Sequence, residues 1–418
     1  MFDRLFERSH ALARHLSGPL VDERRRYLAH CAKQAMAKST LRRIADLLMA
    51  AEEYLKLAER PFATIAIQEI EEAGSRWSTR KSLPPIRLHP RVSRQRFIHT
   101  AVGWLTFINR LQIPSKPVRV YDQMIVEFAE FMQKERGLAS RTIHQRCFTV
   151  REFFDRLLER ERSLNTITVA YVDSVLAQKV NEEHYARVTV RNYASSLRSF
   201  FLYAEMRNWC PAGIAGAIMS PRVFHHESLP SGPTWNDVRK LLATTAGDHP
   251  TAIRDRAILM LFAIYGVRAG EVSRLQLSDI EWQRETIVFT RSKLIGSHSF
   301  PLCQSVGEAI IRYLKEVRPR SSRRELFLTM RAPFRPLTSI ALWPVVARRL
   351  QKLGVSLRHR GPHSLRHACA TRLINEGLSL KEVGDHLGHR DPETTRIYAK
   401  VDLIRLREVA SFDLGGLL

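Results

Sequence analysis

The stretch from residue 363 to residue 400, HSLRHACATRLINEGLSLKEVGDHLGHRDPETTRIYAK, sets apolar residues at helical spacing among phosphate-binding groups. Pro362 suits the first turn of a helix, and Gly377 suits its end. A second short helix is expected to stop at Gly388 and to deliver His389 at its exit. The stretch therefore predicts successive short helices that bury one face and carry chemistry on another.

The polar groups of this stretch fall at regular positions. His363 and Arg366 stand at i and i+3, so on a helix they project from one face. Asp391 can cap a further helix that carries Tyr398. Taken singly, each has a commoner structural role: a surface or core histidine, a solvated arginine, or a tyrosine at the edge of a core.

Two more basic residues lie upstream. Arg268 follows the apolar run from residue 257 to residue 267, which predicts a buried helix. Lys293 lies in the turn between two β-suited runs, residues 285–291 and 297–302, which predict a hairpin.

Together these residues suit metal-free transfer at a phosphodiester. Two guanidiniums can clamp the non-bridging oxygens, and a tyrosine oxygen can act as the nucleophile. No paired carboxylates accompany them to hold a catalytic metal, so neither a metal nor a cofactor is expected.

Composition favours a polyanionic partner. The 418 residues include 66 lysines and arginines against 42 acidic residues, a formal net charge of +24. Hydrophobic residues make up 44% of the chain, which is enough for packed cores. A ribosomal or membrane-surface protein is the alternative, but neither a basic amphipathic anchor nor a spanning segment is evident. Nucleic acid is the favoured partner.

The N-terminus and the cysteines point to a reducing compartment. Charges are scattered through the first 16 residues, unlike the apolar core of a secretion signal. The five cysteines are widely separated and form no CxxC pair, so neither a disulfide framework nor a zinc site is suggested. A cytoplasmic location fits these features.

The chain divides into three predicted blocks. We expect a helical N-terminal domain at 1–110 that ends in a basic, proline-containing linker, with residues 74–96 outside packed helix. That linker can lie along a DNA groove or act as a solvated hinge. A helical bundle is expected at 115–222, and helices with a short β region at 230–418. The predicted fold class is mainly α with a small β-sheet.

The motifs YGVRAGEVSRLQLSDIEW, HSLRHACATRLINEG and LGHRDPETTRIYAKVD resemble those of the tyrosine recombinase (phage integrase) family. The bundle resembles the family's SAM-like core-binding domain, and the last block resembles its α+β catalytic domain. The resemblance covers about residues 118–405 and implies these catalytic residues: Arg268, Lys293, His363, Arg366, His389 and Tyr398.

The resemblance further implies how the enzyme works. Tyr398 would form a 3′-phosphotyrosine and free a 5′-hydroxyl, while Arg268, Arg366 and His389 would stabilise the phosphorane. His363 would assist proton transfer from the tyrosine, and Lys293 would protonate the leaving oxygen. Four protomers would act on double-stranded DNA with inverted half-sites, through a Holliday junction, in a cytoplasmic, nucleoid-associated setting. No membrane partner is expected.

Some features depart from the family pattern. His298 stands where the family often has an arginine, and residues 1–110 match no family element. This extra block suggests a mobile-element integrase or transposase. The tail after Tyr398 is expected to dock on a neighbouring protomer or to fold back on its own domain. Two alternatives stay open: a type IB topoisomerase-like nicking-closing enzyme, and a non-catalytic DNA-binding regulator of the same fold.

Overall fold

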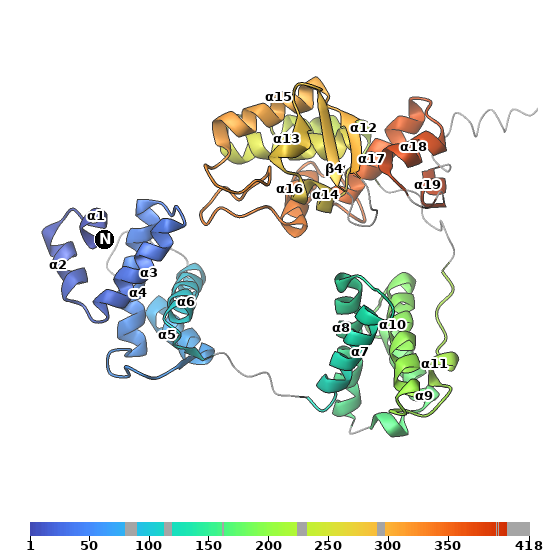
Figure 1. Cartoon of the computed structure of the whole chain (residues 1–418), viewed down its shortest axis with the longest axis horizontal. Coiled ribbons are helices and arrows are strands. Elements are labelled where there is room, and N and C mark those ends of the chain that lie inside the picture. Colours follow the sequence, from blue (N-terminus) through green and yellow to red (C-terminus); the bar gives the residue numbers. More distant parts are fainter. Residues whose placement is uncertain are drawn as a thin grey trace, which may run out of the picture. The chain divides into compact units, whose positions relative to one another are not determined.

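A computed structural model describes residues 1–79, 90–112, 119–160, 163–223, 232–290, 297–389, 391 and 393–398. Over these residues the protein is mainly helical, with a three-stranded sheet and one pair of two-residue strands, so the predicted fold class is confirmed (Figure 1). Two compact units are present: Pro114–Glu227, and Met1–Ile113 with Ser228–Leu418. No helix in the described ranges is both long and apolar enough to cross a bilayer.

The N-terminal segment packs around its own hydrophobic core. Its elements are α1 Phe2–Leu5, α2 Ser9–Ser17, α3 Val21–Lys33, α4 Lys38–Leu55, β1 Ile65–Ala66, α5 Ile67–Thr79, α6 Pro90–Phe107 and β2 Leu111–Gln112. Helices α4, α5 and α6 contact one another around the fully buried Phe97 and Trp104. Gly74 permits the close approach of α5 and α6, because a Cβ there would lie 3.0 Å from Ile98 Cγ1.

The prediction that residues 74–96 lie outside packed helix is wrong at both ends. Helix α5 continues to Thr79, and α6 begins at Pro90, where a missing N–H is tolerated in the first turn. Aromatic packing stabilises both helices despite the many basic residues nearby, since the Trp77 ring of α5 stacks on Phe97 of α6 with centroids 5.5 Å apart. Residues 80–89 lie outside the described part of the chain.

The second segment is a helical bundle. Its elements are α7 Asp122–Lys134, α8 Ser140–Glu159, a 3-10 turn Leu164–Thr166, α9 Val169–Asn181, α10 Arg187–Met206 and α11 Ile214–Ala217. Buried phenylalanines of α8 and α10 form its centre, with Phe154 and Phe200 perpendicular at 5.2 Å. The buried Lys179 ammonium pairs with Glu152 and, at 2.9 Å, with Glu183. These ion pairs compensate the cost of burying its charge.

The C-terminal segment is built around one buried helix. Its elements are α12 Trp235–Ala243, α13 Pro250–Tyr265, α14 Ala269–Arg274, a 3-10 turn Leu277–Asp279, β3 Ile280–Glu281, β4 Thr286–Thr290, β5 Ser297–Pro301, α15 Gln304–Arg312, a π-helical turn Tyr313–Val317, α16 Ser339–Lys352, α17 Pro362–Asn375, α18 Leu380–Leu387 and α19 Glu393–Arg396. Helix α13 contacts α12, α14, α15, α16 and α17. The predicted buried helix is therefore confirmed, and it forms the scaffold of this segment.

The predicted hairpin is also confirmed. Strands β4 and β5 pair antiparallel, with Phe289 opposite His298, and β3 adds a short third strand beside β4. Tyr265, the last residue of α13, fixes the sheet to the helix: its hydroxyl donates to the Pro301 carbonyl at 2.8 Å and accepts from the Cys303 amide at 3.0 Å.

A buried ion cluster joins α13 to α16. Asp255 is almost fully buried, and its two oxygens accept from Arg254 and Arg349, each at 2.7 Å. Removing the carboxylate would leave two poorly hydrated guanidiniums without their partner.

We expect Asp255→Asn to lower the free energy of unfolding by about 3 kcal/mol, because a broken buried ion pair leaves uncompensated charge. Urea unfolding followed by tryptophan fluorescence measures this. Asp248→Asn is the matched control, because Asp248 also pairs with an arginine, Arg312, but its side chain is 92% exposed. The urea midpoint of this variant should barely move. Equal shifts in both variants would contradict the argument.

Candidate active site

The site begins at a sharp turn after α13. Gly266 ends the helix in the left-handed region with φ of 58°, and Arg268 follows just before α14. A side chain at Gly266 is disfavoured for two reasons: this φ is strained for other residues, and a Cβ would lie 2.6 Å from Leu387 Cδ2. The turn therefore brings the ends of α13 and α18 into direct contact.

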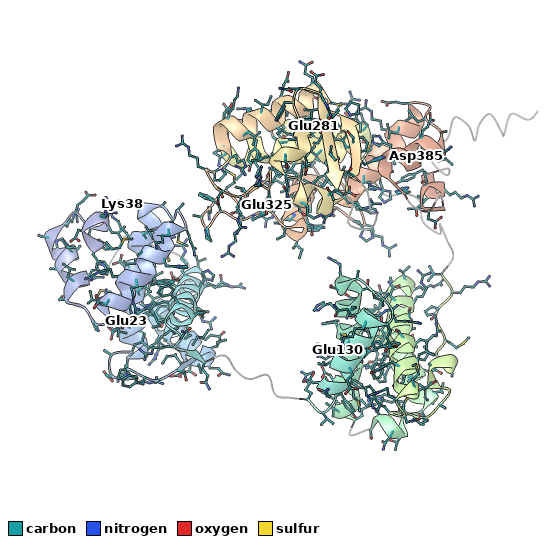
Figure 2. The ribbon with its side chains drawn as sticks, in the orientation of Figure 1. Glu23, Lys38, Glu130, Glu281, Glu325 and Asp385 are labelled. Atoms are coloured by element: carbon teal, nitrogen blue, oxygen red, sulfur yellow. The ribbon has the colours of Figure 1, made fainter. Side chains whose placement is uncertain are left out.

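Two arginines hold these helix ends together. Arg366 on α17 is 3% exposed and donates to the carbonyls of Gly266 at 2.6 Å and Leu387 at 2.7 Å. Arg268 pairs with the buried Glu271 at 3.1 Å and donates to the Gly388 carbonyl at 3.3 Å. Both guanidiniums are thus oriented from the same two loops, α13–α14 and the exit of α18. Asp385 marks helix α18 in Figure 2.

The two arginines and His363 line one cavity of about 440 Å³. His359 and Trp343 contribute to the same wall. The cavity concentrates donors and positive charge, the arrangement that stabilises a phosphate whose charge grows during transfer. The structure therefore brings together three of the six residues singled out in the sequence.

Two histidines of α17, His363 and His367, have lowered pKa values. Burial, reinforced by the charges of Arg366, His359 and Arg268, lowers the pKa of His363, although the residue remains exposed to solvent. His367, one turn further along α17, contacts the His363 ring with centroids 4.5 Å apart. Burial, with the positive field of His363 and Arg366, lowers the pKa of His367 to about 4.

Tyr398 lies beside His367, the second histidine of this pair. It is 2% exposed, and its hydroxyl lies 2.9 Å from His367 Nδ1. Burial raises the pKa of Tyr398 to about 12, partly offset by the charge of Arg366. Tyr398 is not among the residues that line the 440 Å³ cavity. The His367 ring contacts both the His363 ring and the Tyr398 ring.

Of the last two predicted residues, His389 lies in the described part of the chain and Lys293 does not. His389 follows α18, as predicted, and its Nδ1 lies 2.7 Å from the hydroxyl of the buried Thr395 in α19. Lys293 lies outside the described residues. The ends of its hairpin are described: Thr290 pairs with Ser297, and Arg274 of α14 donates to the Thr290 carbonyl at 3.5 Å.

Three residues of the site were missed in the sequence. His367 follows Arg366 directly and stands at i+4 from His363, so helical spacing could have placed it on the same face. His359 and Trp343 reach the cavity through tertiary packing and gave no such signal. Trp343 lies so close to Gly361 that a Cβ there would meet its ring at 2.5 Å.

The described residues offer no group of three or more His, Cys, Asp or Glu side chains arranged to hold a metal ion. The polar side chains at the cavity are guanidiniums, imidazoles, the Ser339 hydroxyl and the Trp343 indole. They are suited to bind an anion directly.

Comparison with known proteins identifies two matched segments. The family described as Phage integrase family matches residues 234–403, and the family described as Phage integrase, N-terminal SAM-like domain matches residues 125–208. A putative integrase/recombinase, y4rA, of Sinorhizobium fredii (strain NBRC 101917 / NGR234) is 33% identical over 305 residues, covering 72% of this chain and 73% of the relative. Tyrosine recombinase XerC of Halalkalibacterium halodurans is 29% identical, covering 69% and 96%.

Solved structures share the fold. The XerH site-specific recombinase bound to palindromic difH substrate superposes with a TM-score of 0.53 at 18% identity, covering 82% of this chain and 94% of that one. The Tn1549 transposon integrase in complex with transposon right end DNA gives 0.50 at 17%, covering 68% and 99%. The cavity and Tyr398 lie within the matched catalytic segment. The chain therefore belongs to the phage integrase family and is a tyrosine-type site-specific recombinase, an enzyme that cuts and rejoins DNA strands.

Proposed function

We propose that Tyr398 attacks the scissile phosphate of duplex DNA, forming a 3′-phosphotyrosine bond and releasing a 5′-hydroxyl. The observation that carries this assignment is the cavity lined by Arg268, His363 and Arg366, with the Tyr398 hydroxyl bonded to the next histidine of the same helix. The covalent bond conserves the energy of the phosphodiester, so a partner strand can rejoin without ATP.

The remaining residues take complementary roles in this proposal. Arg268, Arg366 and His389 stabilise the phosphorane, and the loss of one such donor costs about 3–4 kcal/mol of barrier. His363 assists proton transfer from the tyrosine. Lys293 protonates the leaving 5′ oxygen, because an alkoxide is a poor leaving group. Glu271 orients Arg268 through the 3.1 Å ion pair.

DNA is the partner, and we propose that four protomers bind two sites built of inverted half-sites. The net charge of +24 supports extended phosphate contact, as do the exposed Arg141 and Arg187 at the starts of α8 and α10. Residues 115–222 and 230–418 would act as two domains of a clamp, with 1–110 as a separate domain. Strand exchange would pass through a Holliday junction.

We further propose an integrase or transposase role on a mobile element, acting at the nucleoid. The similarity to a putative integrase/recombinase of Sinorhizobium fredii supports this role. So does the helical segment before residue 125, which neither matched family segment includes.

Tyr398→Phe should abolish the covalent adduct on a nicked suicide duplex, because only the phenolic oxygen is removed. DNA affinity should stay within about twofold, since the phosphate clamp is intact. Denaturing gels measure the adduct, and mobility shifts measure the affinity. An adduct that persists in this variant would remove Tyr398 from the role of nucleophile.

Lys293→Ala should slow cleavage by about 100-fold, the usual contribution of a general acid. A 5′-bridging phosphorothiolate, whose leaving thiolate needs no proton, should restore the rate. Lys381→Ala, on the exposed face of α18, serves as the control and should cleave both substrates normally. Absence of rescue, with residual cleavage still measurable, would reject the general-acid role.

Arg366→Lys should lose at least 100-fold in adduct formation, because one ammonium cannot replace a planar fork that also spans two carbonyls. The free energy of unfolding should fall by about 2 kcal/mol as a charged hydrogen bond is lost. Arg372→Lys is the matched control, since that residue lies on the same helix but is exposed. Wild-type cleavage by Arg366→Lys would contradict the assignment.

A further inference from the structure

Tyr398 occupies a packed position beside the cavity and outside it. Its ring belongs to a small apolar cluster with Ile374 of α17 and with Val383 and Leu387 of α18. Within the described residues its hydroxyl has a polar contact at 2.9 Å, to His367 Nδ1. The hydroxyl is therefore held by His367, and Tyr398 is not among the residues that line the cavity.

The bond between Tyr398 and His367 joins two groups in their unreactive forms. Because the pKa of His367 is lowered to about 4, its imidazole is neutral at neutral pH and carries a single N–H, so Nδ1 accepts in the tautomer that has its proton on Nε2. Because burial raises the pKa of Tyr398 to about 12, the phenol keeps its proton and donates it to that nitrogen. The resulting neutral hydrogen bond stabilises the resting position without activating the oxygen.

Ring contacts link the cavity to the hydrogen bond between Tyr398 and His367. His363 lines the cavity, and its ring meets the His367 ring edge to face, with an interplanar angle of 71°. The His367 ring in turn lies 5.6 Å from the Tyr398 ring. A phosphate that reorients His363 therefore displaces the direct neighbour of the residue that holds the nucleophile.

We propose that His367 is a positioning residue that holds the Tyr398 hydroxyl outside the cavity until a DNA phosphate engages His363 and the arginines. The proposal rests on the assignment of Tyr398 as the nucleophile. The holding step makes or breaks no covalent bond, and the proton stays on the phenol until attack. Cleavage then requires the exchange of one neutral hydrogen bond for contact with the phosphate.

The test is the single-turnover rate of adduct formation by the full-length protein on a nicked suicide duplex. His367→Phe keeps a ring between its neighbours but removes the acceptor, so adduct formation should become about fivefold faster, the factor expected from one neutral hydrogen bond. His367→Ala should be faster too. His367→Asn places an amide oxygen where Nδ1 was and should return the rate to that of the wild type.

Two controls distinguish the role of His367 in holding Tyr398 from general damage to the site. His386→Ala removes a histidine from the adjacent helix, where its ring packs on Phe300 at 5.2 Å, and should leave the rate unchanged. Adding Tyr398→Phe to His367→Phe should abolish the adduct. An adduct that survives in this double variant, or no adduct from any form, would reject the proposed function itself.

The holding role is overturned if His367→Phe and His367→Ala cleave at the wild-type rate or more slowly. A loss near 100-fold would instead identify His367 as a proton acceptor in the chemical step. A gain of rate cannot arise from a misfolded site, so the expected outcome is distinct from structural damage. If one substitution prevents folding, the other still decides the question.

Discussion

The buried guanidinium of Arg366 is the constraint on which the site depends. A charge that is almost fully buried is tolerated only when its hydrogen-bonding groups are compensated, and two backbone carbonyls contribute to that here. Those carbonyls belong to the ends of two helices that are distant in the sequence, α13 and α18. The hydrogen bonds of Arg366 therefore fix both the turn after α13, which carries Arg268, and the residues after α18, which include His389.

The same constraint explains why Gly266 and Leu387 matter although neither has a reactive group. The helix ends approach closely without strain because Gly266 has no side chain and adopts the left-handed region. Glu271 then holds Arg268 from its own helix, so neither guanidinium depends on DNA for its orientation. Preorganised donors avoid the cost of reorganisation during the reaction, which is where electrostatic catalysis gains its advantage.

Apolar periodicity and the placement of proline and glycine predicted the helices whose formation depends on local sequence. The apolar run before Arg268 predicts a buried helix, and the proline at the start of α17 and the glycine after α18 predict helix ends; the structure confirms these predictions. The contact between Tyr398 and His367 could not be predicted, because helical spacing gives a face but not the partner across it. The extent of α5 and α6 was missed for the same reason: Phe97 and Trp77 stabilise them through tertiary packing.

The hydrogen bonds that hold Arg366 are stronger than the one that holds Tyr398, and this difference suits the reaction. Arg366 is held by charge-assisted bonds inside the core, each stronger than a neutral bond. Tyr398 is held by a neutral hydrogen bond and by non-directional apolar contacts. A phosphate that enters would therefore meet a fixed clamp and a nucleophile that can still move. The reverse arrangement would lose the preorganised clamp and expose a reactive oxygen before DNA had bound.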